Sequence, residues 1–276
     1  MRVTLFGASG LLGQALVQQL KNEELTALSI EDVDLRDRVK VHHAVRASHP
    51  DWIILAAAYT DVDGCESNRD LAFAVNCEGA IHVAQAAVEA GSRLMFLSTD
   101  YVFDGSKTSP YEIGDHRNPI NVYGESKARA EERLLEILPE VCIVRTSWLF
   151  GHSGKCFPAT ILKVAASRPE ISVVNDQRGC PTFSCDLAAS LVQLCYKSAR
   201  GIIHATNSGD CTWYDFAREI LRSSGLSTVV KPVATAEFPR PARRPSYSVL
   251  SAASLQAHGI QMPDWQDALR RYLATS

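Results

Sequence analysis

The sequence lacks the features that would place the protein in a membrane or on a nucleic acid. Its longest apolar stretches, such as "WIILAAAY", have the length of a strand and fall well short of the roughly 20 residues that a membrane span needs. A first strand begins at once, with no charged and then apolar leader, so we expect no signal peptide and a cytoplasmic location. The formal net charge of −3 gives no electrostatic reason to expect a nucleic acid or a membrane surface as a partner.

Cysteine pairs and metal-binding spacings are also missing. The 8 cysteines are scattered, with no C-x-x-C pair, and the 8 histidines show no metal-ligand spacing. We therefore expect reduced thiols and predict no metal site from local clusters, although whether the protein binds a metal stays open. A chain of 276 residues, 46% of them hydrophobic, can bury a large core without disulfide or metal cross-links.

Apolar strand-like runs alternate with helical patterns through the first three quarters of the chain. This alternation, with strands that are apolar on both faces, predicts an α/β protein with a doubly wound, Rossmann-type parallel sheet. The first strand should lie near the centre of that sheet, and a ligand should bind at the carboxyl ends of the strands. Strands are expected in "RVTLFG", "LTALSI", "DWIILAAA", "RLMFLST", "VCIVRTSW" and "GIIHATN", and helices near 11–21, 37–47, 69–90, 122–138 and 184–198.

After Trp148 the alternation becomes less regular. Glycine, proline and polar residues recur in "FGHSGKCFP", "NDQRGCPTF" and "EFPRPARRPSYS", which we interpret as loops of a smaller part of the protein. We predict a dinucleotide-binding domain of residues 1–148 and 184–204. An interleaved, smaller C-terminal substrate-binding domain should comprise residues 149–183 and 205–276.

A glycine-rich turn follows the first predicted strand. In "LFGASGLLGQAL" the glycines Gly7, Gly10 and Gly13 are spaced G-x-x-G-x-x-G, whereas the ordinary dinucleotide fingerprint is G-x-G-x-x-G. Such a turn lets backbone N–H groups approach a pyrophosphate at the positive end of the following helix. The turn alone could also be structural, so its role depends on the rest of the chain.

Two further stretches carry groups that could transfer a proton. Tyr123 and Lys127, in "PINVYGESKARAEERLL", are four residues apart at the start of a predicted helix and share one face of it. A lysine ammonium near a phenol should lower the pKa of the tyrosine and make it a usable acid. The strand "LMFLSTDYVFDG" ends in Ser98, Thr99 and Asp100, at the edge where a ligand is expected. A surface Tyr–Lys contact and simple strand-end hydrogen bonds are the structural alternatives.

Taken together, these motifs resemble those of the extended short-chain dehydrogenase/reductases, and among them the dTDP-4-dehydrorhamnose reductase family. The resemblance runs nearly end to end, and "STDYVFDG" with "NVYGESK" is much more specific than the glycine turn. It is also carried by "GASGLLG", "DWIILAAAYTDVDGCE", "AVNCEGAIHVAQAA", "VRTSWLFG", "GCPTFSCDLA", "WYDFAREI" and "RRPSYSVLS".

The resemblance implies NAD(P)H-dependent reduction of the 4-keto group of a nucleotide-linked deoxy-sugar, dTDP-4-dehydro-L-rhamnose being the expected substrate. It implies that Tyr123 donates a proton to the keto oxygen, that Lys127 binds the nicotinamide ribose, and that Thr99 polarises the same oxygen. Asp100 and Trp148 would contact the sugar. By the resemblance the cofactor would lie on Gly10, Leu11, Leu12, Asp34, Leu35, Ala58, Tyr59, Thr60, Tyr123 and Lys127; the glycine turn and the end of the second strand add Gly7, Gly13 and Ser29.

Several alternatives stay open. At the end of the second strand, Ser29 is neither the acidic residue that favours NADH nor an arginine that favours NADPH, and we lean slightly to NADPH. Ser251 stands where the family pattern has an aspartate, a site we interpret as structural. Arg145, Arg243 and Arg244 could clamp a pyrophosphate or form salt bridges.

The competing functions are a reductase of another nucleotide 4-keto sugar, and a non-catalytic, NADP-binding regulatory subunit of the methionine adenosyltransferase type. A pure binding module would not need Thr99, Tyr123 and Lys127 together, which favours an enzyme. Some family members are dimers with magnesium at the interface. A homodimer and bound magnesium are therefore further expectations that the sequence does not decide.

Overall fold

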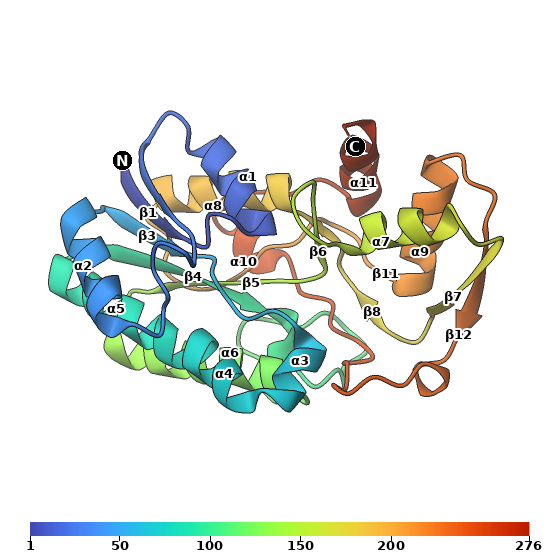
Figure 1. Ribbon diagram of the computed structural model, residues 1–276, viewed down its shortest axis with the longest axis horizontal. Helices are drawn as coiled ribbons and strands as arrows, with labels where there is room; N and C mark the ends of the chain where they lie inside the picture. Colours follow the sequence, from blue (N-terminus) through green and yellow to red (C-terminus); the bar gives the residue numbers. More distant parts are fainter. Residues whose placement is uncertain (276) are drawn as a thin grey trace.

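The computed structural model describes residues 1–275, and its centre is a six-stranded parallel sheet (Figure 1). The strand order is β10-β5-β4-β3-β1-β2, and every neighbouring pair is parallel. The predicted fold class is confirmed. The strands are β1 (Arg2–Phe6), β2 (Glu24–Leu28), β3 (Trp52–Leu55), β4 (Arg93–Thr99), β5 (Cys142–Thr146) and β10 (Gly201–His204).

The position of the first strand differs from the prediction. β1 lies between β3 and the edge strand β2, not near the centre of the sheet. Within residues 1–275 only β2 is added on one side of β1, whereas β3, β4, β5 and β10 are added in turn on the other side. The point where the direction of winding changes, between β1 and β3, is where an open α/β sheet has a crevice for a ligand.

Helices cover both faces of the sheet (Figure 1). Helices α1 (Leu11–Gln19) and α8 (Ser184–Tyr196) pack on one face, and α2 (Arg38–Ser48), α5 (Gly79–Ala90) and α6 (Val122–Ile137) on the other. Successive residues of β3 illustrate the two cores, because Ile54 belongs to the core under α1 and α8, whereas Ile53 belongs to the core under the other three helices. Both faces of β1, β3, β4 and β5 are buried, which explains why these strands are nearly continuous apolar runs, whereas the edge strand β2 is partly exposed.

The predicted helix at 69–90 contains an irregularity. Helix α4 (Arg69–Phe73) continues through a π-helical turn, Ala74–Glu78, into α5. Within residues 1–275, Arg69–Ala90 is the one helical segment long and apolar enough to span a membrane, and half of its most apolar stretch is buried in the protein. Counting uninterrupted apolar runs misses this segment, because polar residues interrupt it. It packs against α2 and α6 as a core helix.

The part of the chain interpreted as loops contains regular structure as well. Helices α7 (Phe157–Ala165), α9 (Trp213–Ser223) and α11 (Trp265–Ala274) enclose their own apolar core, which includes Phe150 and Phe216. Strands β7 (Glu170–Val174) and β12 (Val229–Val233) form a parallel pair beside them. Short strands connect this part to the sheet, and small helices complete the chain: β6 (Leu149–Phe150), β8 (Arg178–Gly179), β9 (Thr182–Phe183), β11 (Cys211–Thr212), α3 (Val62–Ser67) and α10 (Ala253–Gln256).

Candidate active site

A cleft of about 770 Å³ lies at the carboxyl ends of β1, β2, β3, β4 and β5. Residues that end or follow these strands line it, as expected for a ligand crevice in an open α/β sheet. Every predicted site residue except Tyr59 lines the cleft: Gly7, Gly10, Leu11, Leu12, Gly13, Ser29, Asp34, Leu35, Ala58, Thr60, Thr99, Asp100, Tyr123, Lys127 and Trp148.

The glycine turn has the shape of an anion cradle. Gly7 has φ +92°, and a Cβ atom there would lie 2.5 Å from the backbone N of Ala57. A Cβ atom at Gly13 would lie 2.0 Å from the Gly7 carbonyl oxygen, so both positions require glycine. At Gly10, the N-cap of α1, the corresponding contact is 3.3 Å, and no side chain of the described residues caps the helix. The first N–H groups of α1 are therefore available to a pyrophosphate, and the residues present fit a dinucleotide.

Acidic residues surround the end of β2. The Ser29 N–H and hydroxyl both donate to Asp32 Oδ2, at 2.8 and 2.7 Å. Asp34 accepts from Arg36 Nε at 2.9 and 3.0 Å, and the side-chain hydrogen bond from Arg36 lowers the pKa of Asp34. The Ser29 hydroxyl is thus already donating to a carboxylate, which counts against our lean to NADPH. Arg36, which lies beside Asp34, counts in the other direction.

Thr99, the last residue of β4, and Asp100 after it line the cleft side by side. The Thr99 hydroxyl donates to Asp100 Oδ1 at 3.1 Å and accepts from the Tyr101 N–H at 3.2 Å. Asp100 is 2% exposed, and among residues 1–275 its Oδ2 has no hydrogen-bond partner. Burial raises the pKa of Asp100 to about 7, although hydrogen bonds from Ser248 and Thr99 oppose the shift. The cleft therefore contains a buried carboxyl oxygen that a ligand hydroxyl could satisfy.

Tyr123 and Lys127 differ from the expectation in their electrostatics. Burial, and then the Asp100 carboxylate, raise the pKa of Tyr123 above its ordinary value, and the Thr99 hydroxyl only partly offsets them. Burial lowers the pKa of Lys127 to about 7, and its Nζ lies 4.0 Å from the centre of the Phe96 ring. The prediction that Lys127 lowers the pKa of Tyr123 is wrong for the ligand-free protein, because removal of the phenol from water outweighs any effect of the lysine. Tyr123 is consequently held as a protonated phenol, which is the form that donates a proton.

An asparagine that the sequence reasoning missed connects the cofactor side of the cleft to Tyr123. Asn76 lies in the π-helical turn and is 1% exposed. Its Oδ1 accepts from the Tyr59 N–H at 2.8 Å, and its Nδ2 donates to the Tyr59 carbonyl at 3.1 Å and to Ser126 Oγ at 3.0 Å. Ser126 Oγ donates in turn to the Tyr123 carbonyl at 2.8 Å. The motif "AVNCEGAIHVAQAA" contained this residue, and a π-helical turn often marks a functional site.

Arg145 does not reach the cleft. It is 1% exposed, and its Nε and Nη2 donate to the two carboxylate oxygens of Glu131 at 2.9 and 2.6 Å. Ser98 Oγ donates to the same carboxylate at 2.5 Å, and Arg117 Nη1 at 3.2 Å. The hypothesis that Arg145 clamps a substrate pyrophosphate is therefore wrong, and this arginine belongs to a buried ion cluster.

The other two arginines also lie outside the residues that line the cleft. Arg244 Nη1 donates to Asp63 Oδ1 at 2.6 Å, which ties its segment to α3. Arg243 is exposed, and its carbonyl accepts from Asn121 Nδ2 at 2.8 Å. Ser251 accepts a bond from the Ala253 N–H at the start of α10, at 3.3 Å. These contacts support the structural interpretation of Arg244 and Ser251, whereas the contact of Arg243 involves only its backbone.

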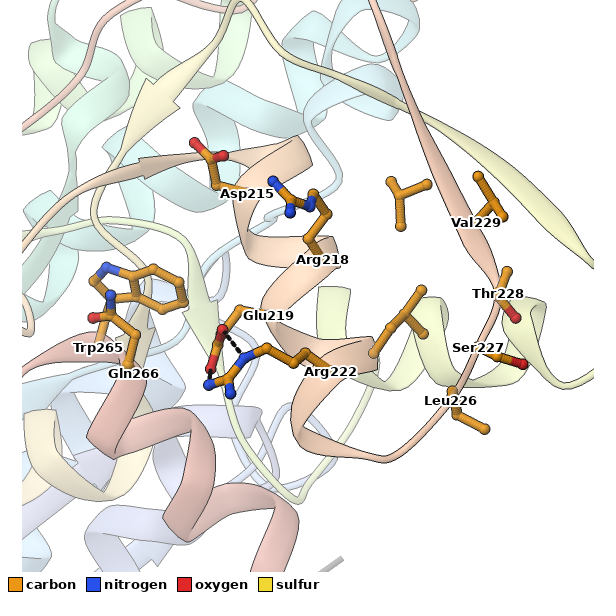
Figure 2. A pocket seen from close by; sticks show the side chains of 12 residues that line it. Asp215, Arg218, Glu219, Arg222, Leu226, Ser227, Thr228, Val229, Trp265 and Gln266 are labelled. Atoms are coloured by element: carbon orange, nitrogen blue, oxygen red, sulfur yellow. Dashed lines mark hydrogen bonds and ion pairs between the residues drawn. The ribbon is translucent and has the colours of Figure 1, made fainter.

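A second cavity of about 690 Å³ lies beside α9 and β12 (Figure 2). Figure 2 shows Arg222 turned toward Glu219, which accepts from it at 2.6 and 2.8 Å. None of the predicted site residues lines this cavity. Over the whole described range, no three His, Cys, Asp or Glu side chains converge as a metal site.

Known proteins match the whole chain. The family model described as "RmlD substrate binding domain" matches residues 1–276. A dTDP-4-dehydrorhamnose reductase of Mycobacterium tuberculosis H37Rv is 40% identical to the chain, covering 99% of it and 92% of the relative. The chain belongs to the dTDP-4-dehydrorhamnose reductase family. The predicted family is thereby confirmed.

Two further relatives extend the comparison. The crystal structure of the dTDP-4-dehydrorhamnose reductase of Bacillus anthracis, in complex with NADP, superposes with a TM-score of 0.97 at 38% identity and covers 100% of this chain and 99% of its own. The spore coat polysaccharide biosynthesis protein SpsK of Bacillus subtilis is 40% identical over 99% of this chain and 96% of its own length. The names of the Mycobacterium and Bacillus anthracis relatives agree with the predicted chemistry, which is the reduction of a keto sugar linked to a nucleotide.

Proposed function

We propose that this protein reduces the 4-keto group of dTDP-4-dehydro-L-rhamnose to give dTDP-L-rhamnose, with NADPH or NADH as reductant. One observation carries the proposal. A protonated phenol, a strand-end hydroxyl and a buried carboxyl (Tyr123, Thr99 and Asp100) share one cleft with an N-terminal glycine cradle. The names of the relatives, and the NADP in the Bacillus anthracis structure, support the same assignment.

The roles of the residues follow from their surroundings. When bound, the reduced nicotinamide supplies a hydride to the carbonyl carbon of the sugar. Tyr123 donates its proton to the keto oxygen. Its raised pKa keeps the phenol protonated before the reaction, and the same shift makes it a weaker acid than an ordinary tyrosine. The Thr99 hydroxyl lies within hydrogen-bonding reach of the phenol and polarises the same oxygen. Asp100 accepts a sugar hydroxyl through Oδ2, and Trp148 packs against the sugar.

The cofactor would lie along the other half of the cleft. The pyrophosphate contacts the Gly7–Gly13 turn with Leu11 and Leu12, and the adenosine lies beside Ser29, Asp34 and Leu35. Ala58 and Thr60 line its path, the backbone of Tyr59 between them is held by Asn76, and Lys127 donates to the nicotinamide ribose. The lining of the cleft supports this arrangement, which places both ends of a dinucleotide on residues from different strand ends.

We extend the proposal to the setting of the enzyme. Residues 149–183 and 205–276 form the substrate-binding part, and residues 1–148 and 184–204 the cofactor-binding part. The protein acts in the cytoplasm on a small-molecule nucleotide sugar, with neither a nucleic acid nor a membrane as partner. The family resemblance alone supports a homodimer with magnesium, and light scattering with and without the ion tests it.

Single-turnover oxidation of bound NADPH on adding dTDP-4-dehydro-L-rhamnose tests the function. General acid catalysis is worth about 10²–10⁴-fold, so Tyr123→Phe should slow the step by about that factor while NADPH still binds. Tyr101→Phe is the matched control, because it removes another phenol hydroxyl from the same cleft, on a ring 6.2 Å from Tyr123. The control should lose less than about tenfold.

Each alternative has its own outcome. Equal rates for wild type and Tyr123→Phe would remove the tyrosine from the mechanism. Oxidation only with a different 4-keto sugar nucleotide would change the substrate assignment. NADPH binding without oxidation by any such sugar would favour a regulatory subunit.

A further inference from the structure

Two sequence motifs meet beside Trp148, and the proposed chemistry gives neither of them a role. "GCPTFSCDLA" begins with Gly179 in β8, and "WYDFAREI" begins with Trp213, the first residue of α9. β8 and β11 pair antiparallel with Gly179 opposite Cys211, which brings the start of α9 next to Gly179. Figure 1 shows β6 between the sheet and helix α7, with β8 and β11 close to α7 and α9. Three segments distant in sequence thus converge on one indole.

The indole rings of Trp148 and Trp213 are stacked. Their centroids are 3.5 Å apart, the planes differ by 6°, and both residues line the cleft. A Cβ atom at Gly179 would lie 2.5 Å from Cε2 of Trp148, so any other residue there would displace the ring. The glycine therefore provides space for the indole.

The backbone of Trp148 needs this support. Its φ of 45° lies in the left-handed region, which bulky side chains seldom adopt and which persists only where the surroundings hold it. Trp213 is itself fixed by the capping box of α9, in which the Asp215 N–H donates to Thr212 Oγ1 at 3.1 Å and the Thr212 N–H to Asp215 Oδ2 at 3.2 Å. A rigid helix start thus holds a strained residue.

We propose that Trp213 is a positioning residue for substrate selection: it holds the Trp148 indole as a rigid apolar wall for the C–H face of a 6-deoxy sugar. The inference rests on the proposed function, since the sugar nucleotide must bind on the Trp148 side of the cleft. A deoxy sugar carries a methyl group in place of a hydroxymethyl group, so it gains more than a fully hydroxylated sugar from a flat apolar surface.

Three variants test the inference with dTDP-4-dehydro-L-rhamnose as substrate. Trp213→Leu removes the ring, Trp213→Phe keeps an aromatic ring, and Tyr214→Leu is the matched control. Tyr214 is the next residue of α9 and packs against the same core, but it lies outside the cleft lining. A stacked aromatic pair is worth enough to change KM by about three- to tenfold, so Trp213→Leu should raise KM by about that factor. Trp213→Phe should recover most of the loss, and the control should not change KM.

Two readouts separate positioning from general stability. The Kd of NADPH should stay within about twofold in all three variants, because the cofactor cradle is elsewhere in the cleft. Stacked indoles couple their transitions, so wild type and Tyr214→Leu should show a near-UV circular dichroism couplet that both Trp213 variants lose. Saturating dTDP-L-rhamnose should alter the couplet in wild type, a measurement that needs neither a variant nor turnover.

Loss of the couplet with an unchanged KM would overturn the inference. So would parallel changes in KM and in the Kd of NADPH that Tyr214→Leu reproduces. If Trp213→Leu does not fold, a couplet that product binding leaves unchanged in wild type is the overturning result. Absence of turnover in wild type would instead defeat the proposed function.

Discussion

Replacing Asp100 by asparagine should stabilise the ligand-free protein at pH 8. The carboxyl is 2% exposed, and Oδ2 finds no partner among residues 1–275, so its charged form is poorly solvated. Burial raises its pKa from 3.8 to about 7. An amide of the same shape carries no charge and can still accept the bond from Thr99.

The sign and size follow from proton linkage. Below pH 3.8 the carboxyl is protonated in both states and costs nothing. Between pH 3.8 and 7 the unfolded chain releases the proton while the folded protein keeps it, so the stability of the protein falls as pH rises. A shift of about three units corresponds to about 4 kcal/mol above pH 7. Asp100→Asn should recover about 2 to 4 kcal/mol at pH 8 and almost nothing at pH 4.

Urea unfolding of wild type and variant at both pH values measures the effect, and Asp104→Asn is a control of opposite sign. Asp104 accepts from the Ser106 N–H at 2.9 Å, and this bond contributes most to lowering its pKa to about 2. Its stabilising contribution is present above pH 3.8 and is lost as pH falls toward 2, so Asp104→Asn should destabilise at pH 8. An Asp100→Asn protein that gains nothing at pH 8, while the control behaves as expected, would refute the reasoning.

Three other changes probe the cofactor side of the cleft. Gly10→Val should weaken NADPH binding about tenfold or more in a fluorescence titration, because the side chain adds bulk where the backbone meets the pyrophosphate. The variant should still fold, since a Cβ atom at this position meets only the Gly7 carbonyl, at 3.3 Å. An unchanged Kd would show that the pyrophosphate does not bind at this turn. The kcat/KM values of wild type for NADPH and NADH should differ by less than about a hundredfold, which corresponds to about 2.7 kcal/mol. Asp32→Asn should shift the ratio of these two values toward NADPH. An unchanged ratio would show that the Asp32 carboxylate does not contact the adenosine ribose. Asn76→Ala should cost about 1 to 3 kcal/mol of stability and lower kcat, because it leaves both backbone groups of Tyr59 without their partner; normal kcat in a destabilised variant would make Asn76 purely structural.

Local pattern predicted the sheet and most of the cleft. The alternation of strands and helices is a short-range signal, and a parallel sheet brings the carboxyl ends of its strands to one edge. Residues after different strands, such as Gly7, Ala58 and Thr99, therefore lie in one cleft although no sequence pattern connects them. The role of Gly7 and Gly13 could also be predicted, since close backbone approaches occur at fixed positions of a strand-to-helix turn.

What escaped prediction depends on contacts between distant segments. The sequence alone could not show whether Arg145 binds a pyrophosphate or forms an ion pair, because its role depends on burial beside Glu131, a residue on another element. The pKa of Tyr123 moved opposite to the expectation, since helical spacing shows a lysine nearby but not the loss of water around both groups. Helix α9 was not predicted, because the segments around it are rich in glycine and proline, although Phe216 and Ile220 form an apolar stripe along it.

The order in which the chain supplies the residues of its apolar cores matters during synthesis. Five strands of the sheet are complete at residue 146, but the face that carries α1 also needs Leu187, Leu191 and Leu194 of α8. Between them lie residues 149–183, which contribute to the separate core under α7, α9 and α11. At about 5–20 residues per second, roughly 40 more residues take roughly 2 to 8 s to emerge. A nascent chain paused in this interval exposes a broad apolar sheet face, so slow codons or a missing chaperone would act most strongly there.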